Sequence, residues 1–390
     1  MGQSCTADET YFLCVKTFSS KLFLMKIAFV HDFLLRLGGA ERVLQVLMDM
    51  YPEAPVYTLL YDEKKVGHVF PKDRVRTSSL QKFHAFLPGM HKFLFPFMPG
   101  AIEQFDFSGF DVVVSSSGAY SHGVVTNLET RHICYYHSPM RYAWDYTHEY
   151  LKEQRLGFFG ELFVGRALHK IREWDFLAAQ RVDEVIANSK TVKNRIRKYY
   201  RQESLVVHPP VDTDRFEPHP KNEGYFLIVS QLSRYKRIDL AVELFNMLGK
   251  RLVVIGTGPE ERHLKRMAAG NVDFLGFKSD EVVKEYMENC RAFIFPGEDD
   301  FGIAPVEAMA CGKPVLGLRR GGLTETMIEG ITGEFFEEQT LESMEAGLTQ
   351  LLIHEKGYKA SVIAKHAKEY SVKAFKKAMK SVIERVTIQP

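Results

Sequence analysis

The chain has 390 residues, of which 45% are hydrophobic and 26% charged, and its 51 basic against 49 acidic residues give a formal charge of +2. A chain of this length exceeds the size at which one hydrophobic core stops growing, so two globular domains are expected. The near-neutral charge gives no reason to expect nucleic acid as a partner. The five cysteines are widely spread and contain no Cys-x-x-Cys pair, which disfavours a disulfide framework or a zinc site and is typical of a reducing cytoplasm.

The first 24 residues are interpreted as an extension that is not part of the fold, because they precede a second methionine, Met25, and the first buried strand. The opening Met-Gly-Gln-Ser-Cys-Thr matches the N-myristoylation pattern, with Cys5 as a palmitoylation candidate. An overlong start is the simpler explanation. No run reaches the roughly 18 uninterrupted apolar residues that a membrane-spanning helix needs, so the protein is not expected to be integral to a membrane.

From Met25 onwards, short runs rich in Val and Ile alternate with longer helical patterns, which is typical of parallel βαβ units. These units predict a first Rossmann-like domain over residues 25–207. A strand at 26–31, a glycine turn at 37–40 and a helix at 41–50 form the first unit. Further strands are predicted at 55–61, 112–115, 132–136 and 184–187, with a basic helix at 190–199.

Residues 208–224 hold four prolines and no periodicity, so this segment is predicted to be the interdomain linker. A second doubly wound domain is predicted over residues 225–370. The tail at 371–390 is predicted to be an amphipathic helix that packs back on the first domain. Strands of the second domain are predicted at 225–229, 252–255, 272–275, 292–295 and 314–316.

The stretch 295–317 carries the clearest chemical signal. An apolar strand leads into an acidic, glycine-containing turn, and Pro305 is predicted to open a short helix because its missing N–H costs nothing there. A helix N-terminus directs unpaired N–H groups at one point, which suits a phosphate. Asp299 in the loop and Glu307 on the helix can accept hydrogen bonds from vicinal hydroxyls, so a nucleotide sugar fits better than a bare phosphate.

Three further candidate positions follow predicted strands. Gly38 and Gly39 would let backbone N–H groups approach a phosphate, and a plain tight turn is the alternative. His137 opens a polar and aromatic segment, where a catalytic and a core role are equally consistent with the sequence. Lys236 and Arg237 begin a helix, where a cation could neutralise a leaving diphosphate or simply be solvated.

Other groups are assigned no chemistry. His31 also ends a strand and is interpreted as structural. Gly256-Thr-Gly258 follows a strand, but Glu261 stands where the dinucleotide fingerprint needs its third glycine, which excludes NAD or FAD. No metal is expected, because the one Asp-x-Asp spacing, Asp212 and Asp214, falls in the predicted linker.

Taken together, these residues resemble the family 4 retaining glycosyltransferases of the GT-B fold, especially the mannosyltransferase-like enzymes of O-antigen, capsule and exopolysaccharide assembly. The resemblance covers residues 25 to about 387 and implies two Rossmann-like domains that face each other across a cleft. It rests on Gly38-Gly-Ala-Glu-Arg42, His137-Ser-Pro-Met-Arg-Tyr-Ala-Trp-Asp145, Tyr235-Lys-Arg-Ile-Asp239 and Asp300-Phe-Gly-Ile-Ala-Pro-Val-Glu-Ala-Met-Ala310.

The resemblance also implies roles for individual residues. Gly39 would approach the donor diphosphate, His137 would contact the transferred sugar and Lys236 would stabilise the leaving phosphate. Glu307 would accept the ribose hydroxyls. The loop from Asp299 through Ile303, which includes Asp300, Phe301 and Gly302, would hold the sugar hydroxyls and the β-phosphate.

Two departures from the family pattern bear on the donor. The family places glutamate at both ends of a seven-residue gap, whereas the first end here is Asp299, with Glu298 directly before it, and either could serve the sugar. Many members carry arginine where this chain has Gln231, so Lys236 and Arg237 would carry more of the phosphate charge. The family mechanism implies front-face retention with the leaving phosphate as base, and no cofactor beyond the nucleotide-sugar substrate.

We therefore expect a cytoplasmic retaining hexosyltransferase, with GDP-mannose as the leading donor and a saccharide or lipid-linked saccharide acceptor in cell-surface polysaccharide synthesis. Aromatic and basic residues at 83–99 and 156–170 suggest either peripheral contact with the inner membrane surface or core helices with snorkelling lysines. One alternative is a nucleotide-sugar epimerase of the same fold, although no acid and base facing the sugar can be identified. The other is a catalytically weak nucleotide-sugar-binding protein, which only Asp299 and Gln231 favour.

Overall fold

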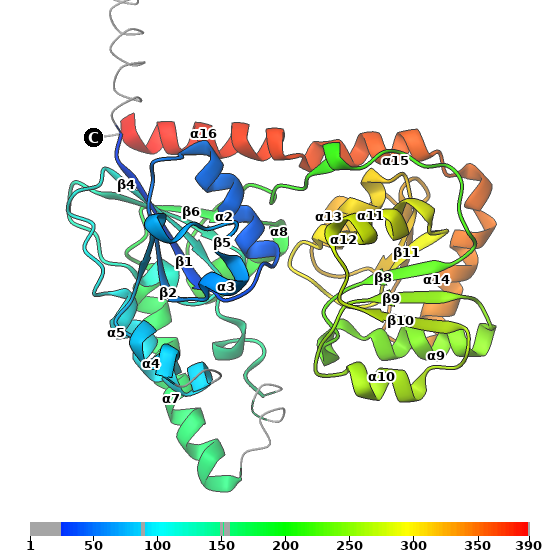
Figure 1. Ribbon diagram of the computed structural model, residues 1–390, viewed down its shortest axis with the longest axis horizontal. Coiled ribbons are helices and arrows are strands. Elements are labelled where there is room, and N and C mark those ends of the chain that lie inside the picture. Colours follow the sequence, from blue (N-terminus) through cyan, green and yellow to red (C-terminus); the bar gives the residue numbers. More distant parts are fainter. Residues whose placement is uncertain (1–24, 87–89, 149–150, 152–156, 389–390) are drawn as a thin grey trace, which may run out of the picture. The chain divides into compact units, whose positions relative to one another are not determined.

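The computed structural model describes residues 25–86, 90–148, 151 and 157–388. The extension expected at 1–24 lies outside the described residues. The chain forms two compact units (Figure 1). Unit 1 comprises Met1–Ala187, Lys193–Leu205 and Lys377–Pro390, and unit 2 comprises Asn188–Val192 and Val206–Lys376.

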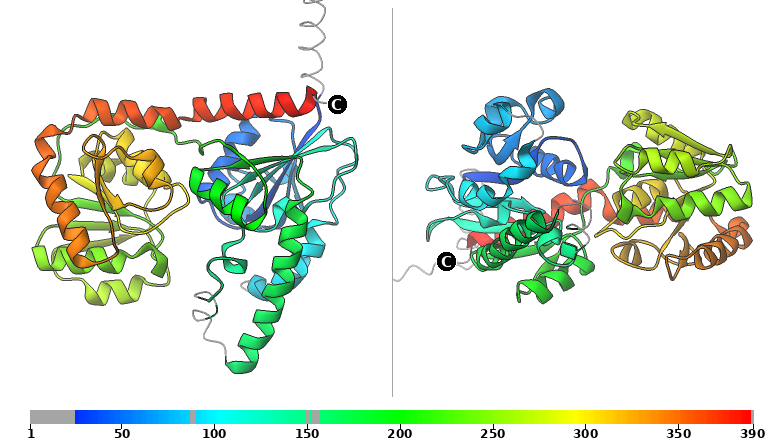
Figure 2. Two further views of the ribbon diagram at one scale, coloured as in Figure 1. Left: turned by 180° about the vertical axis from the view of Figure 1, so that it is seen from behind. Right: turned by 90° about the horizontal axis from the view of Figure 1, so that it is seen from below.

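Unit 1 is built on a seven-stranded sheet in the order β3-β2-β1-β4-β5-β6-β7. The pairs that connect β3 to β6 across the sheet are parallel, and helices lie on both faces (Figures 1 and 2). β4 is buried along its whole length, as expected for a parallel strand covered on both sides. The strands are β1 (Ile27–Leu34), β2 (Val56–Tyr61), β3 (Val75–Thr77), β4 (Val112–Ser117), β5 (Arg131–Tyr136), β6 (Glu184–Ala187) and β7 (Leu205–Val206).

Unit 2 repeats this plan with a six-stranded parallel sheet in the order β10-β9-β8-β11-β12-β13. Successive side chains of β11 enter opposite cores, as strand geometry requires. Phe293 and Phe295 pack in one hydrophobic cluster, and Ala292 and Ile294 pack in the other. The strands are β8 (Phe226–Val229), β9 (Leu252–Ile255), β10 (Val272–Gly276), β11 (Ala292–Phe295), β12 (Val315–Leu318) and β13 (Gly333–Phe336).

Helices α2 to α13 lie between strands along the chain, and α14, α15 and α16 follow the last strand, β13. Their bounds are α2 (Gly39–Met50), α3 (Glu63–Val66), α4 (Gln81–Phe86), α5 (Met98–Ile102), α7 (Phe158–Ala179), α8 (Lys190–Tyr199), α9 (Ile238–Leu248), α10 (Glu261–Met267), α11 (Asp280–Asn289), α12 (Ile303–Ala310), α13 (Leu323–Thr326), α14 (Leu341–Ile353), α15 (Ala360–Ala367) and α16 (Val372–Ile388). The 3₁₀ segments include η2 (Met90–Phe97), η3 (Ser121–Gly123), η4 (Arg141–Ala143) and η6 (Arg234–Lys236). Across the described residues, no helix is long and apolar enough to span a bilayer.

Both sheets reverse the direction of their strand order at one point. In unit 1 the reversal lies between β1 and β4, and in unit 2 it lies between β8 and β11. Ligands of doubly wound sheets bind outside the carboxyl ends of the strands at such a reversal. The prediction of two doubly wound parallel sheets is confirmed, and each sheet has one position where a site is expected.

The helix α16 begins in unit 2 and ends in unit 1. Its apolar positions Phe375, Met379, Ile383 and Val386 are all buried, as their helical spacing predicts. By contrast, the segment predicted as a linker at 208–224 belongs to unit 2. Its side chains contribute to that core, with Val211 1% exposed, and unit 2 resumes at Val206, two residues before the predicted start of this segment.

Candidate functional site

Residues 296–302 of unit 2, called the acidic loop below, connect β11 to α12. Gly302 precedes this helix at φ 85 and ψ 80, a left-handed conformation that favours glycine. The helix therefore begins at Ile303, and the predicted start at Pro305 is wrong by two residues. Pro305 still falls in the first turn, where the missing N–H has no intrahelical partner to lose.

Glycines let neighbouring loops pack directly on the acidic loop. The Gly322 N–H donates to the Asp299 carbonyl oxygen at 2.9 Å, and a Cβ on Gly322 would lie 2.3 Å from the Cα of Phe301. On the other side, a Cβ on Gly297 would lie 2.8 Å from the Cα of Lys236. Backbones can approach this closely only where no side chain intervenes, so packing on both sides fixes the course of the acidic loop.

Lys236 and Asp299 form an ion pair in which the Lys236 Nζ contacts both carboxylate oxygens. Their side chains are 13% and 24% exposed. The Nζ also lies 5.0 Å from the ring centroid of Tyr235 and 5.9 Å from that of Phe295, an environment that favours a cation. Because Lys236 follows β8 and Asp299 follows β11, the structure brings two predicted site residues together at the strand-order reversal of unit 2.

The neighbouring Arg237 takes a left-handed conformation, with φ 51. Its Nε lies 3.2 Å from the Asp239 carboxylate, and its Nη1 donates to the Gln339 side-chain oxygen at 3.4 Å. Gln339 in turn donates to the carbonyl oxygen of Pro296 in the acidic loop at 3.3 Å. Arg237 is therefore connected to the acidic loop through a side-chain amide rather than directly.

Phe301 differs from the other loop residues because its side chain is only 3% exposed. Its ring packs against His208 and Tyr370, with centroids 5.5 and 5.7 Å away. This side chain belongs to the core of unit 2, which leaves only the backbone of Phe301 for contact with a ligand. The remaining predicted residues of the loop and helix are half-buried, namely Glu298, Asp300, Ile303 and Glu307.

In unit 1 the glycine turn precedes α2, and its two glycines differ in what they present. The Gly38 N–H donates to the Glu41 Oε2 at 2.9 Å, and a Cβ on Gly38 would lie 2.9 Å from the same oxygen. Gly38 is therefore occupied by an internal contact. Gly39 is the first residue of α2, where the N–H has no acceptor within the helix, so Gly39 is the better candidate for contact with a phosphate.

A polar chain runs from this turn to His137. The Glu41 Oε1 lies 3.8 Å from His31 Nε2. His31 Nδ1 is 3.1 Å from the Ser116 Oγ, and the same Oγ is 2.7 Å from His137 Nε2. The structure thus connects two predicted parts of the site in unit 1, the turn and His137, through residues that were not predicted.

The pKa values of His31 and His137 are shifted in opposite directions. Burial lowers the pKa of His31, but the hydrogen bond and charge of Glu41, with a smaller effect of Asp32, outweigh it and the pKa is raised. Burial would raise the pKa of Glu41, but His31 outweighs that effect and the pKa is lowered. Burial, followed by repulsion from His31, lowers the pKa of His137 to about 4. Below the raised pKa of His31, His31 and Glu41 therefore form an ion pair, and His137 is uncharged wherever the pH lies well above 4.

These charge states define the direction of the hydrogen bonds. A protonated His31 can only donate from both ring nitrogens, so the Ser116 oxygen accepts from His31 and its hydroxyl donates to His137 Nε2. Neutral His137 then carries its proton on Nδ1. This assignment follows from the network, as histidine tautomers generally must.

Buried carboxylates hold the loops around His137. The Asp32 carboxylate accepts hydrogen bonds from the N–H groups of Gly118, Tyr120 and Ser121 at 2.6–2.7 Å. It thereby fixes the turn that follows β4.

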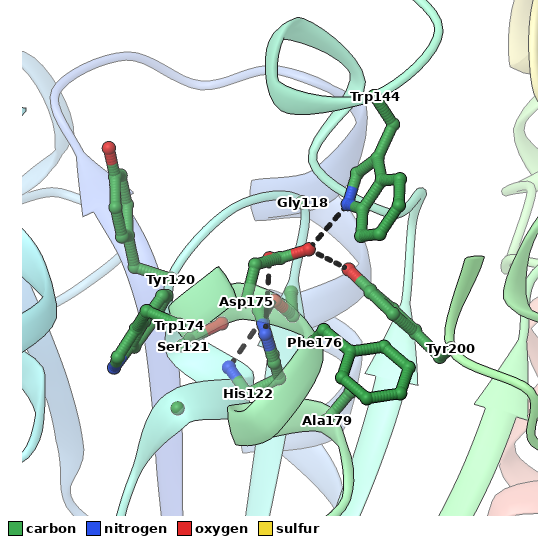
Figure 3. A network of polar contacts seen from close by, with 12 residues as sticks. Gly118, Tyr120, Ser121, His122, Trp144, Trp174, Asp175, Phe176, Ala179 and Tyr200 are labelled. Atoms are coloured by element: carbon green, nitrogen blue, oxygen red, sulfur yellow. Dashed lines mark hydrogen bonds and ion pairs between the residues drawn. The ribbon is translucent and has the colours of Figure 1, made fainter. Parts of the chain in front are cut away.

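The second buried carboxylate belongs to Asp175 on α7, and the residue is 0% exposed. Figure 3 shows its contacts. Its Oδ2 accepts from the indole N–H of Trp144 at 2.7 Å and from the hydroxyl of Tyr200 at 2.8 Å. Its Oδ1 lies 3.3 Å from His122 Nε2. Trp144 is the last but one residue of the polar segment that His137 opens, so Asp175 anchors the far end of that segment to α7.

Sequence reasoning missed the supporting residues. Glu41 was detectable, because an acidic residue three positions after a helix N-cap is typical of a capping box. The roles of Ser116 and Asp175 depend on contacts between distant parts of the chain, and no local pattern indicates them. Within the described ranges, no three His, Cys, Asp or Glu side chains gather as a metal-ion site.

Comparison with known proteins defines the class first. The fold matches that of Anabaena HepE solved in complex with UDP-glucose, with a TM-score of 0.67, 18% identity and coverage of 93% of this chain and 100% of HepE. Two parallel, doubly wound sheets in one chain are the architecture of the GT-B glycosyltransferases, so this chain has the GT-B fold.

Two family models then match the chain, "Glycosyltransferase Family 4" over residues 37–215 and "Glycosyl transferases group 1" over residues 210–370. Together they extend from residue 37 to residue 370. The chain belongs to the family 4 glycosyltransferases, as its motifs predicted.

Curated relatives include mannosyltransferases. The GDP-mannose-dependent alpha-(1-6)-phosphatidylinositol dimannoside mannosyltransferase of Mycobacterium tuberculosis is 28% identical over 188 residues, 43% of this chain and 49% of the relative. The alpha-1,3/1,6-mannosyltransferase ALG2 of Debaryomyces hansenii is 25% identical over 372 residues, 78% of this chain and 76% of the relative. The chain spans about half the length of the first curated relatives it matches.

Proposed function

We propose that this glycosyltransferase moves a hexose from a nucleotide sugar onto a saccharide or lipid-linked saccharide acceptor with retention of configuration. The observation that carries the proposal is the Lys236–Asp299 ion pair at the strand-order reversal of unit 2. This pair places a cation against the loop that leads into α12, and the N-terminus of a helix favours an anion. A diphosphate is the anion that a nucleotide-sugar donor would supply.

In the proposed reaction, the bond between the sugar C1 and the β-phosphate oxygen breaks, and its electron pair moves to the phosphate. Lys236 stabilises the growing negative charge, because an ammonium already held in place costs no reorganisation when the charge develops. The acceptor hydroxyl attacks C1 on the same face and transfers its proton to the leaving phosphate. Carboxylates near the sugar then serve as hydroxyl ligands rather than as a nucleophile and an acid.

The roles of the two acidic loop residues can be separated on this basis. The Asp299 carboxylate is engaged by Lys236, so we assign it to holding the ammonium. Glu298, one methylene longer and adjacent in sequence, is then the candidate sugar ligand. Glu307, one turn into α12, is the candidate for the ribose hydroxyls, with backbone contacts from Asp300, Phe301, Gly302 and Ile303.

In unit 1, we assign Gly39 to the diphosphate and His137 to the transferred sugar. A neutral His137 with its proton on Nδ1 can donate one hydrogen bond to a sugar oxygen, while Ser116 satisfies its Nε2. No metal is required in this proposal, because side-chain cations and helix N-termini supply the stabilising charge.

For the donor, GDP-mannose is supported by the relative whose name states dependence on it, and mannose is supported by ALG2. HepE is solved with UDP-glucose, so a uridine donor belongs in the test. We further propose a role in cell-surface polysaccharide synthesis, in the cytoplasm and at the inner membrane surface.

The test is transfer of labelled sugar onto a membrane lipid extract from a panel of GDP- and UDP-linked donors. We expect transfer from GDP-mannose by the wild-type protein. Binding of the nucleotides without transfer from any donor would contradict the proposed activity. Glu298→Gln and Asp299→Asn then separate the two carboxylates, since only Glu298→Gln should raise the donor KM without displacing Lys236.

A further inference from the structure

A groove of about 450 Å³ lies in unit 1 between α7 and the segment formed by η2 and α5. Its apolar walls are Pro96 and Pro99 from one side and Phe163, Ile171 and Trp174 from α7. The volume falls in the range of small-molecule sites. Figures 1 and 2 show α7 projecting beyond the sheet of unit 1, with α4 and α5 beside it.

The face of α7 that lines the groove is regular. Phe163, Arg166, Ala167, Lys170, Ile171 and Trp174 recur at the spacing of one helical face. An apolar helical face normally packs into a core, but Phe163 is 68% exposed. Core packing accounts for the inner end of this face, where Ile171 is 3% exposed and Trp174 packs against the core of unit 1. It does not account for Phe163, and the snorkelling alternative also leaves this exposed phenylalanine unexplained.

The acidic side chains near the groove are paired with groups other than Arg166 and Lys170, the two cations that line it. Trp174 donates its indole N–H to the Glu103 Oε1 at 2.8 Å, and the same oxygen accepts from Arg181 at 2.8 Å. Glu173 lies 3.2 Å from His169. Among the residues that the structure describes, Arg166 and Lys170 have no ion-pair partner.

We propose that this groove binds the lipid carrier of the acceptor, namely a long acyl or isoprenoid chain that ends in a phosphate. The chain would lie on Phe163, Ala167 and the two prolines, with Ile171 and Trp174 forming the buried inner end of the groove. The phosphate would contact Arg166 and Lys170, one helical turn apart. An apolar floor beside unpaired cations is complementary to this chemistry and not to a neutral sugar. The inference rests on the proposed function, because it names the part of the acceptor that the donor site does not recognise.

The groove contains a tryptophan whose fluorescence can report binding. The chain has two tryptophans, and one of them, Trp174, lines the groove, while the indole of Trp144 is bonded to the buried Asp175. The experiment titrates the full chain with geranylgeranyl phosphate in dilute detergent and follows tryptophan fluorescence. Geranylgeraniol, which lacks the phosphate, and inorganic phosphate, which lacks the chain, are titrated in parallel.

We expect saturable binding of geranylgeranyl phosphate and at least tenfold weaker binding of the alcohol. Phe163→Asp and the double variant Arg166→Gln/Lys170→Gln should each weaken binding at least tenfold. Matched controls are Leu177→Asp, on the same helix and 62% exposed, and Lys64→Gln/Lys65→Gln on α3, which should bind as the wild type does. Circular dichroism melting checks that every variant is folded.

Wild-type affinity in the groove variants would overturn the proposal, as would the absence of saturable binding. Loss of attachment to phosphatidylglycerol vesicles with unchanged geranylgeranyl phosphate affinity would also overturn it, because the groove would then contact bulk lipid. Since binding is measured without a donor, failure of the transferase proposal leaves this result unaffected. Conversely, the groove variants should keep wild-type transfer to a short water-soluble saccharide.

Discussion

Replacing Glu41 with glutamine is expected to destabilise unit 1 in a pH-dependent way. Glutamine keeps the side-chain oxygen that caps Gly38 but removes the charge that faces His31. The two side chains are 12% and 3% exposed, and removing one partner of a buried ion pair costs about 3–5 kcal/mol. We expect about 3 kcal/mol, because the 3.8 Å separation is longer than that of a close charge-assisted hydrogen bond.

The pH at which the loss is greatest follows from the pKa shifts. Glu41 has a folded pKa below its ordinary value of 4.5, so its contribution is present above pH 4.5 and is lost as the pH falls through the folded pKa. His31 has a folded pKa above its ordinary value of 6.5, so its contribution is complete below pH 6.5 and is lost as the pH rises through the folded pKa. The pair therefore stabilises the wild type most between these values.

Tryptophan fluorescence during urea unfolding measures this effect in the right part of the molecule, because both tryptophans, Trp144 and Trp174, lie in unit 1. We expect Glu41→Gln to lose about 3 kcal/mol at about pH 5.5 and clearly less at about pH 9. The control Glu63→Gln breaks an exposed pair with Lys72 at 3.1 Å and should cost under about 1 kcal/mol at both values. Equal destabilisation of Glu41→Gln at the two pH values would refute the assigned ion pair.

Three further variants test unit 2. Lys236→Ala should lower the transfer rate at least ~100-fold, because it removes the cation that stabilises the leaving phosphate. Lys265→Ala is the control and should keep the wild-type rate, since the Lys265 ammonium contacts Glu261 instead. Comparable initial rates for the two variants would contradict the role of Lys236. Glu307→Ala should also abolish measurable transfer while its melting temperature stays within a few degrees of the wild type, and full activity would rule out the ribose contact. Gly322→Ala should lower the free energy of unfolding in urea by about 1–3 kcal/mol and reduce donor affinity, because its Cβ would meet the Phe301 backbone at 2.3 Å. Gly270→Ala is the matched control, since a Cβ there would have nothing within 4 Å. Equal stability of the two variants would show that the loops of Gly322 and Phe301 can separate.

The strand framework could be predicted wherever a strand is a buried run of apolar residues. The bounds of β6, β9 and β11 agree with those expected at 184–187, 252–255 and 292–295. The short strands β3, β7 and β13 were missed. In β3 the residues Arg76 and Thr77 are exposed, and β13 contains Gly333 and Glu334, so neither strand carries the apolar pattern on which the prediction depends.

The candidate site could be predicted one residue at a time, but its internal contacts could not. Lys236 and Asp299 were each selected for their place after a strand, whereas their ion pair joins loops 63 positions apart. Phe301 was selected with its neighbours because a motif carries no information on which side chain turns into the core. His31 was interpreted as structural because its significance depends on Glu41 and Ser116, which only the folded sheet brings beside it.

The central claim is that the donor site of unit 2 supports front-face transfer, with Lys236 stabilising the leaving diphosphate. The most direct test is the anomeric configuration of the product formed from GDP-α-mannose, determined by NMR at early reaction times before any rearrangement. The account predicts an α-linked mannoside, the same configuration as in the donor. A β-linked product would contradict it, because inversion requires attack from the face opposite the diphosphate and a separate base for the acceptor hydroxyl.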